Sequence, residues 1–315
     1  MPIVNYNLPM SYEYKTVHEI AQKWQIAERT VRHYCSEGRI PGAILEGKTW
    51  LIPSNSEKPE RQPRHTKFSQ KDNILSILKR EKEAQLKGGI YHYVQIALTY
   101  NSNHIEGSKL TEEQTRHIFE TKTIGITENP IQIDDIVETI NHFRCVDLVI
   151  ESAKSKLTES FIKQLHFILK TGTTNSQKSW FKVGGYKLLE NEVANTQTAK
   201  PKEVATKMKE LIQKYNSKKT ITFEDILDFH VKFEKIHPFQ DGNGRVGRLI
   251  MFEECLKHNI VPFIITDQLK LFYYRGISEW HNTQGYLTDT CLTAQDEFKL
   301  VLERFGISFS KEILN

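Results

Sequence analysis

With 315 residues, the chain is longer than one typical domain, so two folding units are the default expectation. Hydrophobic residues make up 38% of the sequence and the mean hydropathy is −0.50, which indicates an ordinary soluble protein with enough apolar side chains for a core and excludes a chain built of membrane spans. The net charge of +4 is compatible with a nucleic-acid partner but does not indicate one.

The cysteines and the start of the chain bear on its location. Cys35, Cys145, Cys255 and Cys291 are far apart and match no metal-ligand spacing, so we expect reduced thiols in the core. No signal peptide opens the sequence, and apolar stretches such as 260–265 fall far short of the roughly 20 residues that span a bilayer. We expect a cytoplasmic protein without a membrane partner.

Residues 1–53 contain the pattern of a small winged helix-turn-helix domain. The run 16–19 has the form of a capping box ahead of a first helix, and a second helix follows before Gly38. Two β-rich runs, 43–45 and 49–52, predict a hairpin because a Gly-containing turn separates them. The residues of the second helix expected to face outward are Arg29, Arg32 and His33.

Residues 54–70 are polar and broken by prolines, a composition typical of a linker. The remainder, 71–315, is predicted to be mainly α-helical. Its one clear interruption precedes residue 201, where 183–189 and 192–196 predict a short β-hairpin. The expected helices include about 88–107, 112–120, 133–151, 160–169, 202–215 and 223–236.

The segment His237–Arg248, HPFQDGNGRVGR, concentrates polar residues between two predicted helices. Gly242 and Gly244 allow unusual backbone angles and close approach to a ligand, and the N–H groups at the start of the next helix can hold an anion. Arg245 and Arg248 are three residues apart, so they share one side of that helix, where guanidinium groups suit phosphate oxygens. The sequence therefore predicts a phosphate-binding turn.

Two further residues of this segment suit catalysis. Asp241 offers a hard oxygen ligand for Mg²⁺, which in proteins often bridges a carboxylate and phosphates. His237 has the side chain whose unperturbed pKa suits a general base near neutral pH.

The run Gly242–Gly247 also satisfies G-x-G-x-x-G, the fingerprint of dinucleotide-binding folds. That interpretation requires a preceding β-strand and an acidic residue about 20 positions later. Asp267 loosely meets the second condition. The segment before the motif has helical periodicity, however, and we reject the interpretation on that ground.

The segment 237–248 matches in full the HxFx(D/E)GNGRxxR signature and resembles the Fic family. The resemblance implies a helical Fic fold with a β-hairpin flap, and transfer of a nucleotide, usually AMP from ATP, to a protein hydroxyl. It implies that His237 is the base, Phe239 a buried anchor and Asp241 the Mg²⁺ ligand. The residues implied to bind ATP are Gly242, Asn243 and Gly244 near the α-phosphate, Arg245 at the α and β phosphates, and Arg248 at the γ-phosphate.

A second match lies upstream. Ser102-Asn-His-Ile-Glu106-Gly107 fits the (S/T)xxxE(G/N) inhibitory motif of many Fic proteins, and Ser102 and Glu106 share a helix face. The resemblance implies that Glu106 pairs with Arg248 in place of the γ-phosphate, so that ATP binds unproductively. In some relatives the same glutamate assists removal of AMP, and a bifunctional enzyme is therefore an open alternative.

Two weaker likenesses concern target and nucleotide binding. Residues 183–196 fall where the family has its flap, which holds the target as an added strand, although Lys187 replaces the usual arginine. Tyr274 lies in a region where relatives contact adenine, but core packing explains Tyr273 and Tyr274 equally well. The family resemblance leaves room for a homodimer, which no residue pattern here indicates.

The amino-terminal pattern resembles the helix-turn-helix domains of excisionase and MerR type, which implies that Arg29, Arg32 and His33 face the DNA major groove. Residues 1–64 contain nine Lys/Arg and seven Asp/Glu, a net of only +2, so docking to a protein is an alternative to DNA.

Two functions are therefore carried forward from the sequence. The first is an autoinhibited protein adenylyltransferase that also labels itself. The second is a DNA-binding transcriptional regulator whose Fic domain senses nucleotide. The presence of His237 favours the first, because a sensor needs no base.

Overall fold

The computed structural model describes residues 13–36, 38–46, 49–59, 73–125, 130–193 and 196–307. The chain divides into two compact units, Met1–Gln62 and Pro63–Asn315. The division falls within the predicted linker, most of which lies outside the described residues.

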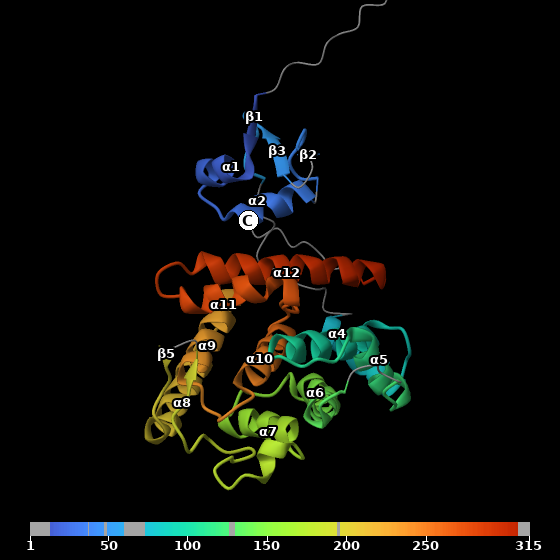
Figure 1. Ribbon diagram of the computed structural model, residues 1–315, viewed down its shortest axis with the longest axis vertical. Helices are drawn as coiled ribbons and strands as arrows, with labels where there is room; N and C mark the ends of the chain where they lie inside the picture. Colours follow the sequence, from blue (N-terminus) through green and yellow to red (C-terminus); the bar gives the residue numbers. More distant parts are fainter. Residues whose placement is uncertain are drawn as a thin grey trace, which may run out of the picture. The chain divides into compact units, whose positions relative to one another are not determined.

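The first unit combines two short helices with a three-stranded antiparallel sheet of order β1-β3-β2 (Figure 1). Its elements are β1 (Tyr14–Thr16), α1 (Val17–Trp24), α2 (Glu28–Ser36), β2 (Ile44–Glu46) and β3 (Thr49–Pro53). The predicted hairpin corresponds to β2 and β3, whereas β1 was not predicted. Its three residues are too few to show an alternating pattern, and it pairs with β3 from Tyr14 opposite Pro53 to Thr16 opposite Leu51.

The first unit has a small core of its own. Ile20 of α1, Val31 of α2 and Ile52 of β3 are completely buried and belong to one cluster. The predicted capping box is confirmed, since Thr16 and Glu19 bond each other's backbone N–H groups at the start of α1.

The second unit is mainly helical, as predicted. The helices are α3 (Ile74–Glu83), α4 (Ile90–Ile105), α5 (Glu112–Thr121), α6 (Ile133–Ser152), α7 (Glu159–Lys170), α8 (Pro201–Asn216), α9 (Phe223–Ile236), α10 (Asn243–Lys257), α11 (Lys270–Ser278) and α12 (Gly285–Arg304), with short 3₁₀ turns at Thr174–Gln177 and Asp267–Leu269. The bounds of α5 to α9 agree with the predicted ranges to within one or two residues. In the part of the chain described here, no helix is long and apolar enough to cross a membrane.

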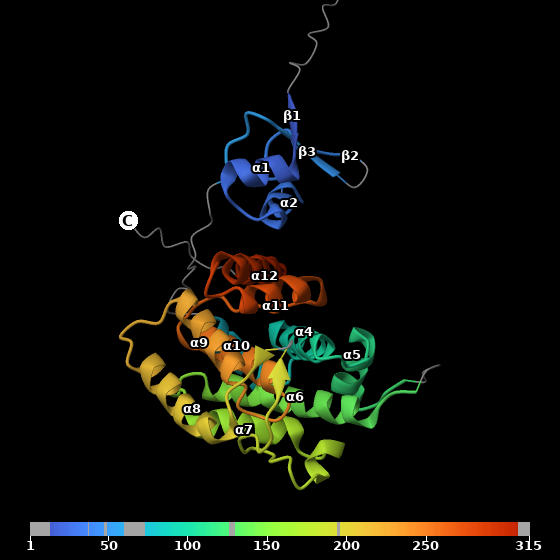
Figure 2. The same ribbon diagram turned by 60° about the vertical axis from the view of Figure 1, so that its left-hand side comes forward.

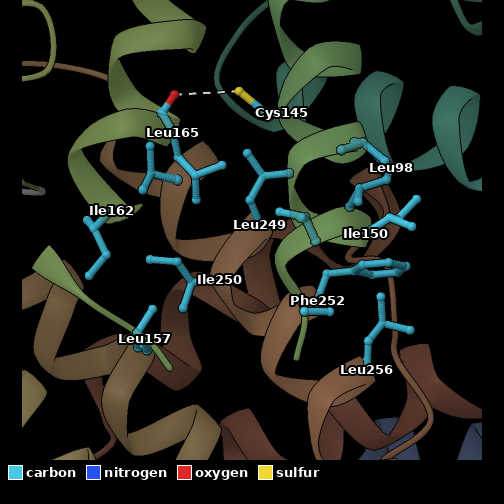
Figure 3. Packing of buried hydrophobic residues seen from close by; sticks show 14 of the residues in the cluster. Leu98, Cys145, Ile150, Leu157, Ile162, Leu165, Leu249, Ile250, Phe252 and Leu256 are labelled. Atoms are coloured by element: carbon cyan, nitrogen blue, oxygen red, sulfur yellow. Dashed lines mark hydrogen bonds between the residues drawn. The ribbon is translucent and has the colours of Figure 1, made fainter. Parts of the chain in front are cut away.

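Helix α10 is the centre of this unit. It packs against α9, α6, α7 and α4, while α8 packs on α9 and α11 on α12 (Figure 2). Figure 3 shows Leu249 and Ile250 of α10 among apolar side chains of α6 and α7, where the Cys145 thiol donates to the Leu165 carbonyl at 3.5 Å. All four cysteines are buried and free, as predicted. Helix α10 is therefore anchored in the core, and the loop before it begins from a fixed position.

One part of the predicted hairpin is wrong. The strands are β4 (Glu192–Val193) and β5 (Thr196–Gln197), which pair with each other, and 183–189 is not a strand. Gly184 has φ of +72°, which interrupts an extended run. The N–H of Lys187 donates instead to the Pro238 carbonyl at 2.9 Å, so this segment braces the loop that follows α9.

Candidate active site

The predicted phosphate-binding turn is the loop between α9 and α10. His237 caps α9 in the left-handed conformation, with φ of +50°, and its N–H donates to the Phe233 carbonyl at 2.9 Å. Gly242, with φ of +82°, is the N-cap of α10. Two residues in the left-handed region thus connect the consecutive helices. At the second of them, position 242, glycine adopts this conformation without steric cost.

The loop is fixed by a buried anchor and a side-chain clamp. The Phe239 ring is fully buried and stacks on His166, with centroids 4.0 Å apart and planes 1° from parallel. Asn243 accepts from the Phe239 N–H at 2.8 Å and donates to its carbonyl at 2.9 Å. The Asn243 side chain therefore shapes the loop, which leaves its backbone N–H as the group for the phosphate contact that the family resemblance implies.

The start of α10 has the geometry of an anion site. Its first helical hydrogen bond runs from the Val246 N–H to the Gly242 carbonyl, so the N–H groups before Val246 precede the helical ladder. A Cβ on Gly244 would meet Oε1 of Glu106 and Nη1 of Arg248, so a larger residue here would displace the Glu106 carboxylate. The carboxylate of Glu106 therefore lies directly against the start of α10.

His237 is largely buried, with 17% of its side chain exposed. Burial, and then the positive charge of Lys187, lower its pKa to about 4, so the imidazole is neutral at pH 7. Its Nδ1 lies 3.8 Å from Oε2 of Glu234, which precedes it by one helical turn. A neutral imidazole can accept a proton, as a general base must.

Asp241 belongs to a cluster of two carboxylates and two cations. Its Oδ2 accepts from Nζ of Lys170 at 2.5 Å, and its Oδ1 lies 3.5 Å from the Arg245 guanidinium. Lys170 and Arg245 also both pair with Glu138 of α6. Burial raises the pKa of Asp241, but Arg245 and Lys170 outweigh it and lower this pKa to about 2, so the carboxylate is ionised at neutral pH.

Arg248 is buried, and two of its three guanidinium nitrogens bond the end of α4, while the third, Nη1, has no hydrogen-bond partner among the described residues. Its Nε donates to Oγ of Ser102 at 3.0 Å, and its Nη2 donates to the Ser102 carbonyl at 2.9 Å and to Oε1 of Glu106 at 2.7 Å. The predicted contact between Glu106 and Arg248 is therefore present. Burial raises the pKa of Glu106, yet Arg248 and Arg245 hold it below its usual value.

Tyr274 lies on α11 with 40% of its surface exposed. Burial of the hydroxyl and then the charge of Glu106 raise its pKa to about 12, which places it within electrostatic reach of that carboxylate. The neighbouring Tyr273 is buried, and its hydroxyl bonds His230 at 2.5 Å. Core packing thus explains Tyr273, while Tyr274 is partly exposed and close enough to Glu106 for the charge of that carboxylate to raise its pKa.

The residues predicted to bind DNA belong to the first unit and lie on α2. Arg32 is exposed and its Nη2 donates to Glu28 at 2.7 Å, while Arg29 and His33 are partly buried. This trio therefore belongs to a different unit from the loop.

Sequence reasoning missed several residues of this site. Glu138, Lys170 and Glu234 lie on helices whose periodicity marks one face as buried, and a charged residue on that face is the signal that would have found them. Lys187, predicted only as a replaced arginine, is buried, and its Nζ donates at 2.6 Å to both Asn191 and Thr198.

Asp241 is the residue that fits a divalent cation. Its side chain is 41% exposed and adjoins the anion-binding start of α10, where phosphate oxygens could complete an octahedral shell. Among the described residues, no group of three or more His, Cys, Asp or Glu side chains is arranged to hold a metal ion. The donor set therefore suits Mg²⁺ bound together with phosphates rather than a protein cage.

Comparisons with known proteins agree with this geometry. Residues 156–254, from the turn before α7 to within α10, match the model of the Fic/DOC family. The chain is 25% identical over 216 residues to the protein adenylyltransferase Fic of Aedes aegypti, covering 68% of this chain and 40% of the relative. It is 25% identical over 184 residues to that of Nematostella vectensis, covering 57% and 42%. The chain thus spans less than half the length of these curated relatives.

Solved structures share the fold. A Fic domain containing signaling protein from Bacteroides thetaiotaomicron superposes with a TM-score of 0.54 at 24% identity, over 74% of this chain and 92% of that one. Fic-1 residues 134–508 from C. elegans give a TM-score of 0.57 at 18% identity, over 73% and 72%.

Proposed function

We propose that this chain is a protein adenylyltransferase that transfers AMP from ATP to a hydroxyl of a protein and is held inactive by Glu106. The observation that carries the proposal is one loop that holds a neutral His237 beside the anion-binding start of α10. The match to the Fic/DOC family and the printed activity of the curated relatives support it.

The reaction assigns each group a task. The neutral imidazole of His237 takes the proton of a Ser, Thr or Tyr hydroxyl, whose oxygen forms a bond to the α-phosphorus. The bond from that phosphorus to the bridging oxygen breaks, and pyrophosphate leaves. The N–H groups of Asn243 and Gly244 and the guanidinium of Arg245 stabilise the charge that develops on the phosphate oxygens.

Magnesium is part of this proposal. Asp241 would hold the ion together with phosphate oxygens, and the ion would supply positive charge at the phosphates. Asp241 is ionised at neutral pH, as a metal ligand must be.

Inhibition rests on the position of Glu106. Its carboxylate lies against Gly244 and binds Arg248, the residue proposed to contact the γ-phosphate. A negative charge at that place repels a phosphate and occupies its arginine. Release of Glu106 would free Arg248 and the helix start together.

The test uses α-labelled ATP with Mg²⁺. We expect Glu106→Gly to label itself or proteins of a lysate at least about tenfold more than wild type, because one buried ion pair no longer opposes phosphate binding. Adding His237→Ala should abolish the label, because the base is gone.

Glu279→Gly is the matched control. Like Glu106 it is a glutamate at a helix C-cap, with φ and ψ of −89° and 6° against −84° and 2°, and its carboxylate bonds Asn282 instead of Arg248. It should label no more than wild type. Absence of label from Glu106→Gly, on itself and on every lysate protein, would contradict the proposed activity.

For the first unit we propose DNA binding through α2, on its resemblance to excisionase-type domains and on the exposure of Arg32. A regulator that uses nucleotide only as a signal is the rival function, and Glu106→Gly separates the two: the adenylyltransferase labels protein in this variant, whereas a pure sensor binds DNA and labels nothing.

A further inference from the structure

Lys170 is a buried cation that none of the proposed chemistry uses. It is the last residue of α7 and only 2% exposed. Burying an ammonium is costly unless carboxylates surround it, and here Asp241 and Glu138 both do. Its stem packs against Gly242, where a Cβ would lie 3.4 Å from Cδ of Lys170. The ammonium is thus held directly behind the loop.

The consequence concerns the net charge at Asp241. Asp241 and Glu138 contribute two negative charges, and Lys170 and Arg245 contribute two positive charges, all within one network of contacts. The cluster is therefore neutral. A carboxylate attracts a divalent cation chiefly through its charge, and a neighbouring ammonium cancels much of that attraction.

We propose that Lys170 sets the affinity of the site for a divalent cation: by neutralising the acidic pair, its ammonium keeps metal binding at Asp241 weak. The inference rests on the proposed function, in which Asp241 holds the metal. Lys170 does not touch the metal itself and acts through the Asp241 carboxylate. The protein alone binds metal poorly, and the phosphates of a nucleotide must supply the remaining negative charge.

The contacts of Lys170 link it to the proposed metal ligand. The ammonium has three N–H donors and shares them between Glu138 of α6 and Oδ2 of Asp241. The Asp241 carboxylate is 41% exposed beside the start of α10, so the charge of Lys170 acts on the one carboxylate of the cluster that a metal ion can reach.

The experiment measures Mn²⁺ binding to the full chain without nucleotide, by electron paramagnetic resonance of the free ion. We expect Lys170→Met to bind Mn²⁺ at least about tenfold more tightly than wild type, because the cluster then carries one net negative charge. Lys170→Gln, whose amide can still bond Asp241, should do the same and serves if the methionine variant does not fold. Circular dichroism checks folding.

Three controls make the result specific. Lys170→Met with Glu138→Gln removes one charge of each sign and should return binding to the wild-type level. Lys170→Arg keeps the charge and should stay weak. Lys163→Met removes a lysine of the same helix that pairs with Glu159 rather than with Asp241, and it should change nothing.

The inference is overturned if both uncharged variants bind Mn²⁺ no more tightly than wild type, or if the double variant binds as tightly as Lys170→Met. Failure of the proposed activity shows separately, as absence of label from Glu106→Gly, because the Mn²⁺ measurement requires no transfer. If Glu106→Gly transfers label while Lys170→Met and Lys170→Gln bind Mn²⁺ like wild type, only the role of Lys170 is refuted.

Discussion

At the scale of single residues, this site depends on where charges are buried. His237 is neutral, while Asp241 and Glu106 are ionised because arginines and a lysine face them. Glu234 behaves in the opposite way. Burial, and then the charge of Glu106, raise its pKa to about 8 against the opposing effect of Arg248. A protonated carboxyl thus lies one turn before the proposed base.

This predicts how stability depends on pH. The folded pKa of Glu234 lies above its unfolded value, so its contribution is fully present below the unfolded pKa and is lost as pH rises towards about 8. We expect Glu234→Gln to lose about 4 kcal/mol less than wild type between pH 5 and pH 8.5, measured by urea unfolding.

The quantity compared is the difference in unfolding free energy between wild type and Glu234→Gln, in which the contributions of all other titrating groups cancel. Glu224→Gln, in the first turn of the same helix, is the control and should follow wild type. Parallel pH profiles for Glu234→Gln and wild type would show that Glu234 is already ionised in the folded protein.

At the scale of elements, the loop between α9 and α10 is a small clamped unit. Phe239 fixes it to α7 through His166, and Asn243 closes it by bonding both backbone groups of Phe239. The loop is therefore held in position by contacts with the protein core, which give it the fixed geometry that positioning of reacting groups requires.

We expect Asn243→Ala to destabilise the protein by about 2 kcal/mol, because it leaves the buried Phe239 N–H without its partner and removes one of two bonds to the Phe239 carbonyl, which also accepts from Asn191 at 3.1 Å. Urea unfolding measures the change. Asn101→Ala is the control: its amide bonds the Ala97 carbonyl within α4 and is only partly buried, so we expect about 1 kcal/mol or less. Equal losses for the two variants would contradict the role of the clamp.

At the scale of the whole molecule, the chain consists of two units with separate cores. The first presents α2, whose Arg32 is exposed, and the second contains the candidate active site. Separate cores allow the two proposed activities to be tested one at a time, since a surface substitution in one unit leaves the packing of the other unchanged.

This predicts the outcome of a DNA-binding measurement. Arg29→Ala with Arg32→Ala should weaken binding to duplex DNA from upstream of the chain's own gene by at least about tenfold, because two cationic contacts are lost. Fluorescence anisotropy at fixed salt measures this. Lys87→Ala with Lys154→Ala removes the same charge from exposed positions of the second unit and should have little effect. Unchanged binding after both arginine substitutions would remove α2 as the recognition helix.

The sequence by itself determined what depends on near neighbours. The helices of the second unit, the capping box at Thr16 and the composition of the loop 237–248 follow from periodicity and local chemistry. The pairing of Glu106 with Arg248 was predicted as well, because a motif resemblance linked two distant segments.

Only the tertiary structure decided the rest. Glu138, Lys170 and Asp241 are far apart along the chain, and no spacing rule links them until α6 and α7 pack on α10. The failed strand at 183–189 has the same cause, since Lys187 bonds the Pro238 carbonyl rather than a neighbouring strand. Long-range packing selects which buried charges meet, and a linear pattern contains no record of that choice.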